Sequence, residues 1–157
     1  MSAPTSGRAP EATFGAVPPA DEVTAGWWRA TGEHRLTVQT CGCGHTQHPP
    51  RALCTGCGAT DLLTLAPTEG TGVVDSFTVV HRAPRPDLPT PYVVARVRLA
   101  EGPILLTRLE GAGVGKEPDS WRIGDPVSVA WHDLDDGRAL PYFVPAVTGT
   151  DQHHREA

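Results

Sequence analysis

Four cysteines lie in one short stretch, TCGCGHTQHPPRALCTGCGATD, and they are all the cysteines of the chain. Cys54 and Cys57 have the spacing of a zinc knuckle, in which two thiolates reach one ion and a following glycine permits the tight turn. A second pair, Cys41 and Cys43, lies shortly upstream, and two such pairs are typical of a zinc ribbon. We therefore expect a structural Zn²⁺ held by four thiolates, with no open position for catalysis.

The first pair departs from this pattern, because one residue separates Cys41 from Cys43 where two are usual. Either both thiols bind the ion, or His45 or His48 replaces one of them. A disulfide or a metal-free ribbon is the alternative, which a reducing compartment disfavours.

The amino-acid composition indicates the fold class. Sixteen Pro and seventeen Gly in 157 residues indicate many turns and few long helices, so the chain is expected to be mostly β. A net charge of −5 is opposite to that of a typical non-specific nucleic-acid binder. The N-terminal residues lack the apolar core of a secretory signal, and no apolar run is long enough to span a membrane, which predicts a cytoplasmic protein.

The chain divides into five predicted segments. Asp21 and Glu22 can begin a short helix that Gly32 ends, and this helix carries Trp27 and Trp28. Two adjacent tryptophans do not easily face one small core, so either both wrap the edge of the domain or at least one meets a partner protein. The expected segments are a disordered N-terminus (1–19), the short helix (20–35), the zinc ribbon (36–66), a barrel (67–147) and a disordered tail (148–157).

Alternating apolar residues predict the barrel. In YVVARVRLA, Val93, Ala95, Val97 and Leu99 share one face, and arginines occupy the other. Similar alternation places Val73, Phe77 and Val79 on one strand, and Val127, Val129 and Trp131 inward on another. Five such segments with short connections fit a five-stranded OB-fold, although other small barrels share the pattern. The segments are TGVVDSFTVVH, YVVARVRLA, ILLTRLEG, DPVSVAWHDL and ALPYFVPA.

With ribbon and barrel in this order, residues 20–146 closely resemble the zinc-ribbon/OB-fold acyl-CoA-associated family long called domain of unknown function 35. Three features together carry the resemblance: the Pro49-Pro50-Arg51 run between the cysteine pairs, the strand GVVDSFTVVHR and the later GRALPYF. The family resemblance implies a short N-terminal helix, a rubredoxin-like zinc ribbon and an OB-fold.

The resemblance also implies an accessory role. Members of this family are partner subunits of thiolase-like enzymes, including lipid-transfer-protein-type aldolases that shorten steroid side chains. Such a subunit docks on the thiolase-like subunit and helps to form the site for CoA or acyl-CoA, while the nucleophile belongs to the partner. Some members are fused to a hydratase-like domain; here a hydratase-like subunit and the thiolase-like subunit are expected as non-covalent partners.

The residues themselves offer little for catalysis, so no catalytic residue is predicted. His81 ends the first barrel strand without an evident carboxylate or nucleophile beside it, and a hydrogen bond to a loop or partner explains it better than a general base. Several arginines could bind the CoA diphosphate or an acidic partner, although alternate arginines on a solvent-facing strand are ordinary. These are Arg82, Arg85, Arg96 and Arg98, with Arg108 on the next strand.

Three rival functions follow from the same features. An OB-fold that binds single-stranded nucleic acid needs a basic groove with stacking aromatics, whereas Phe77 and Trp131 are predicted inward and leave mainly Tyr92. A stand-alone enzyme lacks a nucleophile. A metal or redox sensor has only the irregular Cys41–Cys43 pair in its favour.

Overall fold

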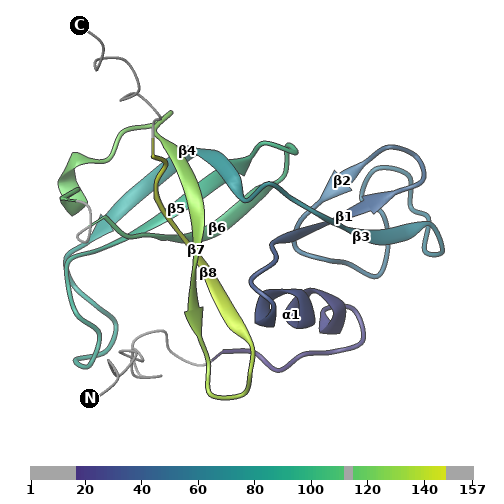
Figure 1. Cartoon of the computed structure of the whole chain (residues 1–157), viewed down its shortest axis with the longest axis horizontal. Helices are drawn as coiled ribbons and strands as arrows, with labels where there is room; N and C mark the ends of the chain where they lie inside the picture. Colours follow the sequence, from purple (N-terminus) through teal and green to yellow (C-terminus); the bar gives the residue numbers. More distant parts are fainter. Residues whose placement is uncertain (1–16, 112–114, 148–157) are drawn as a thin grey trace, which may run out of the picture.

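The computed structural model describes residues 17–111 and 115–147. Residues 1–16 and the tail 148–157, for which disorder was predicted, lie outside these ranges. A small three-stranded sheet and a closed five-stranded barrel lie side by side, and one short helix packs between the sheet and a barrel hairpin (Figure 1). The mostly-β prediction is confirmed.

The helix α1 (Ala25–Gly32) begins after a turn built by Asp21, whose Oδ1 accepts the N–H groups of Val23 and Thr24 at 3.1 and 2.8 Å. Such side-chain turns favour entry into a helix. Both tryptophans of α1 are 8% exposed and pack edge to face with ring centres 4.7 Å apart. Both side chains are mostly buried at the edge of the domain, where they line a small surface pocket, and the expectation that one meets a partner stays a prediction. No described helix is long and apolar enough to cross a membrane.

The ribbon sheet has the order β2–β1–β3, all antiparallel, with β1 (Thr37–Cys41) in the centre, β2 at Thr46–Gln47 and β3 at Leu63–Pro67. Its buried polar centre is a pair of glutamines. Gln39 Oε1 accepts a hydrogen bond from Gln47 Nε2 at 2.6 Å and another from the Arg51 N–H at 3.0 Å. These bonds attach the Pro-Pro-Arg loop to the sheet. They also pair the buried amide of Gln39, which would lower stability if it were left without partners.

The barrel follows in the order β4–β5–β6–β8–β7 and closes where β7 pairs with β4. Most neighbours are antiparallel, but β6 and β8 run parallel and share one bridge, Leu109 with Phe143. This arrangement is consistent with the predicted OB-fold. The strands are β4 (Thr71–Val80), β5 (Tyr92–Leu99), β6 (Ile104–Leu109), β7 (Pro126–Asp133) and β8 (Ala139–Pro145), with a 3₁₀ turn, η3, at Pro118–Ser120.

Alternation along β5 is confirmed, because Val93, Ala95, Val97 and Leu99 are all buried and the arginines between them face outward. Along β4 it is interrupted. Val74 is buried and Val73 exposed, although Phe77 and Val79 pack against the core as expected. A β-bulge between Val74 and Ser76 adds one residue, which moves the inward position from 73 to 74.

Ribbon, helix and barrel share one core. Leu36 and Val38 of the ribbon segment and both tryptophans of α1 belong to the same buried cluster as the barrel residues Val97, Val127 and Phe143. Arg138 on the β7–β8 hairpin covers the ring of Trp28 at 4.5 Å. The ribbon is therefore held in a defined place against the barrel.

Candidate functional site

The four cysteine sulfurs converge at the tip of the ribbon, all within 4.8 Å of one another. Sγ of Cys41 lies 3.7 Å from that of Cys57, and Sγ of Cys43 lies 3.8 Å from that of Cys54. A zinc tetrahedron with Zn–S bonds of about 2.3 Å places its sulfurs about 3.8 Å apart. The four cysteines are thus positioned to bind a metal, and the sulfur spacing fits zinc.

Two similar turns bring the sulfurs together. Each cysteine pair is followed by a glycine at positive φ, Gly44 at 89° and Gly58 at 79°, where a side chain would be strained. In the first turn the N–H of Gly44 donates to the Cys41 carbonyl at 2.9 Å, and in the second the N–H of Gly58 donates to the Cys54 carbonyl at 2.8 Å. The shorter spacing of the first pair is accommodated within this turn.

Neither histidine replaces a cysteine in this cluster. Nε2 of His45 lies 2.9 Å from the hydroxyl of Thr55, and the ring of His48 lies against Trp27 with centroids 5.7 Å apart. Cys43 occupies the fourth corner of the site despite its irregular spacing.

Cys54 loses its thiol proton more readily than Cys41 does. Burial acts to raise the pKa of this thiol, but N–H groups of Cys57 and Gly56, together with neighbouring thiols, lower it to about 6. The Gly56 N–H lies 3.3 Å from the sulfur. At Cys41 the N–H of Cys43 acts to lower the pKa, but burial and the other three sulfurs raise it to about 12. Further thiolates therefore need a cation to neutralise them, as Zn²⁺ does in a closed site.

The arginines predicted to bind CoA or a partner are in two places. Arg96 and Arg98 lie on the outer face of β5, where both approach Asp75, at 3.6 and 2.9 Å. Arg85 lies on the loop after β4 and makes hydrogen bonds to both carboxylate oxygens of Asp87. Arg82 is exposed on the same loop, next to the exposed His81. Both members of the β5 pair thus share one carboxylate.

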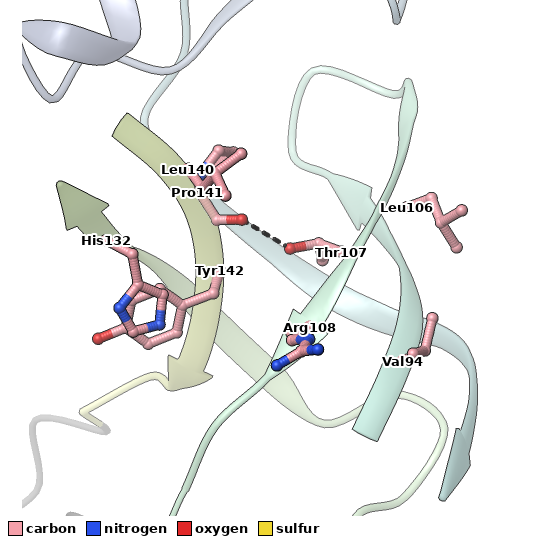
Figure 2. Close-up of a pocket in the computed structure, with 8 residues that line it drawn as sticks. All are labelled: Val94, Leu106, Thr107, Arg108, His132, Leu140, Pro141 and Tyr142. Atoms are coloured by element: carbon pink, nitrogen blue, oxygen red, sulfur yellow. Dashed lines mark hydrogen bonds between the residues drawn. The ribbon is translucent and has the colours of Figure 1, made fainter. Parts of the chain in front are cut away.

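The barrel also has a surface groove that was not predicted from the sequence. It measures about 260 Å³, and its lining includes Leu106 of β6 with Leu140 and Tyr142 of β8 (Figure 2). One signal for it was present in the sequence: Leu105 and Leu106 are adjacent on a strand whose faces should alternate. The segments that form the rest of the groove come together only through strand pairing.

Two family models match the chain and together cover both parts of the fold. The rubredoxin-like zinc ribbon domain of ChsH2 matches residues 28–62, and the C-terminal OB-fold domain of ChsH2 matches residues 66–132. These ranges contain all four cysteines and the strands β4 to β6.

Two curated relatives are longer proteins. A probable enoyl-CoA hydratase alpha subunit of Thermomonospora curvata is 43% identical over 122 residues, covering 77% of this chain and 37% of the relative. The 3-oxo-4,17-pregnadiene-20-carboxyl-CoA hydratase alpha subunit of Mycobacterium tuberculosis is 33% identical over 120 residues, covering 76% of this chain and 37% of the relative. The chain thus spans little more than a third of the length of these two relatives.

A solved structure matches over its whole length. A chain of the Ltp2-ChsH2(DUF35) aldolase superposes with a TM-score of 0.72 at 40% sequence identity, and the match covers 83% of this chain and 100% of that one. The chain therefore belongs to the DUF35 family of ChsH2-type zinc-ribbon and OB-fold proteins.

Proposed function

We propose that the chain is a non-catalytic accessory subunit of a heteromeric acyl-CoA enzyme of the thiolase superfamily. The observation that carries this proposal is the full-length match to the DUF35 chain of an Ltp2-ChsH2 aldolase. In this role the chain docks on a thiolase-like, lipid-transfer-protein-type subunit and helps to form the CoA or acyl-CoA site. The name of the mycobacterial relative, a steroid-type acyl-CoA hydratase subunit, supports acyl-CoA side-chain degradation as the setting.

Within this role Zn²⁺ is structural. Cys41, Cys43, Cys54 and Cys57 would hold it and fill all four positions, so the ion pins the two turns together and presents no open coordination site. Arg82, Arg85, Arg96 and Arg98 are the proposed contacts to CoA or to the partner. Because Asp75 partly neutralises Arg96 and Arg98, a partner surface suits that pair better than a diphosphate.

Native mass spectrometry of the chain mixed with the purified Ltp2 subunit of the solved aldolase tests the proposal. We expect a hetero-oligomer with one Zn²⁺ per copy of this chain, and aldol cleavage of acyl-CoA that neither subunit performs alone. A chain that stays alone contradicts the proposal. A chain that instead binds a labelled oligothymidylate, with affinity falling steeply as salt rises, would support a nucleic-acid-binding OB-fold.

A further inference from the structure

The outer face of β5 and β6 has a regular pattern. Three successive cross-strand pairs each combine one arginine with one aliphatic residue: Val94 with Arg108, Arg96 with Leu106, and Arg98 with Ile104. Solvated faces of antiparallel sheets are normally polar. Here Leu106 is 72% exposed in the middle of a strand, which is unusual for so large an apolar side chain.

The groove lies beside this pattern, where β6 and β8 separate. The two strands share only the bridge between Leu109 and Phe143, and Thr107 Oγ1 donates to the Pro141 carbonyl at 2.9 Å across the gap. Figure 2 shows Leu106 on one side of this hydrogen bond and Tyr142 on the other. We call this site of about 260 Å³ the β6–β8 groove.

One wall of the β6–β8 groove is held in place by stacked rings. The His132 ring lies over the Tyr142 ring with centroids 4.0 Å apart and planes 20° from parallel. Nε2 of His132 lies 2.8 Å from Oε1 of Glu110, which fixes the imidazole from its far side. A wall that is already ordered loses little conformational entropy when a ligand binds, so the groove is pre-organised.

Charge indicates what kind of segment fits. The chain carries a net charge of −5, yet Arg96, Arg98 and Arg108 gather on this one face. Asp75 offsets part of that charge at the first two. On this face an aliphatic side chain lies beside an arginine in each cross-strand pair, so apolar and cationic groups are mixed over the two strands. Its complement is an extended segment that carries both apolar and acidic side chains.

We propose that the β6–β8 groove and the adjoining β5–β6 face dock an extended apolar-acidic segment of the thiolase-like subunit. This inference rests on the proposed function and adds to it the surface and the chemistry of the contact. Leu106 is the central contact, and the arginines steer and orient the segment. A nucleic acid fits less well, because a phosphate backbone would cover an exposed leucine with charge.

The test measures binding of the purified Ltp2 subunit of the solved aldolase to variants of this chain, by biolayer interferometry. Leu106→Ala removes the apolar contact, and we expect it to weaken Kd about tenfold, as for a buried interface anchor. Leu106→Asp is expected to weaken it further, because it places a negative charge where an acidic segment lies. Ile123→Asp is the matched control: Ile123 is 71% exposed but lies outside the groove lining, and its Kd should equal that of the wild type.

Hydrogen–deuterium exchange on the complex provides a second measurement that needs no variant. We expect protection of residues 104–109 and 139–145 when the Ltp2 subunit binds. Wild-type Kd in both Leu106 variants, or protection confined to the ribbon, would overturn the groove as docking surface while the accessory-subunit role stands. A wild-type chain that does not bind the Ltp2 subunit would contradict that role and this surface together. Binding of oligothymidylate that Leu106→Asp abolishes would reassign the face to nucleic acid.

Discussion

At the scale of single residues, similar residue types in the ribbon have separate tasks. Cys43 completes the sulfur cluster, while His45 and His48, the other donors in the same stretch, have partners elsewhere. His48 is mostly buried, and Nδ1 has no hydrogen-bond partner among the described residues. Burial without a partner favours the neutral imidazole and lowers the pKa of His48 to about 4.

His48 should therefore make stability depend on pH. The unfolded chain has the ordinary histidine pKa of 6.5, so between pH 6.5 and 4 it binds more protons than the folded chain. The free energy of unfolding must then fall as pH falls through this window, and the loss at pH 5 is about 2 kcal/mol. Urea unfolding at pH 7 and pH 5 measures it.

A His48→Gln variant is the control for the other titrating groups, including the thiols. We expect its stability to decrease less between pH 7 and pH 5 than that of the wild type. Equal decreases in both proteins would show that His48 does not cause the pH dependence.

At the scale of elements, α1 joins the ribbon to the barrel through a close approach. A Cβ added at Gly32 would lie 2.4 Å from the carbonyl oxygen of Gly137 on the β7–β8 hairpin. Beside it, the hydroxyl of the fully buried Thr31 donates to the carbonyl of Trp28 at 2.9 Å. The end of the helix is thus in direct contact with the backbone of the hairpin.

Gly32→Ala should move this contact apart. Backbone atoms on both sides leave no flexible group to yield, so we expect a loss of about 1–3 kcal/mol in the free energy of unfolding. Gly26→Ala, in the same helix, meets only the flexible end of Leu65 at 2.9 Å and gains helix propensity. Its stability should change by less than about 1 kcal/mol. Urea denaturation of both variants measures these changes in the free energy of unfolding. Equal losses in the two variants would contradict the close-contact explanation.

At the scale of the whole molecule, the shared core predicts that ribbon and barrel unfold together. Leu36 and Val38 pack in the same cluster as Val97 and Phe143, with Trp28 between helix and hairpin. Loss of the metal should therefore destabilise the whole molecule, because β1 carries both the core residue Val38 and the zinc ligand Cys41.

We expect Cys43→Ser to reduce zinc from about one ion per chain to near zero, as measured by plasma mass spectrometry. Calorimetry should show one melting transition with Tm lowered by roughly 5–10 °C, since about 1 kcal/mol shifts Tm by 2–4 °C at this size. His45→Ala should retain both zinc and Tm. Full zinc content in Cys43→Ser, or two separate transitions, would contradict this account.

Much of the fold could be predicted from local sequence. The cysteine spacing with its glycines indicated the ribbon, and strict alternation along residues 92–99 indicated a strand with one buried face. Both are short-range features, because a knuckle closes within a few residues and a strand repeats every two. Alternation misplaced Val73, because a bulge is set by pairing with β5 and not by the types of neighbouring residues.

Local sequence predicts the ribbon and a small five-stranded barrel, because both depend on residue types at short spacings, and the resemblance implies the OB-fold and the family. The three-dimensional arrangement shows in addition that all four cysteines converge, that Trp27 and Trp28 are both buried, and that Leu106 and Tyr142 line one groove. These outcomes depend on contacts between segments far apart in the chain. The parallel meeting of β6 and β8 is the clearest case, since no local pattern specifies which strand closes a barrel.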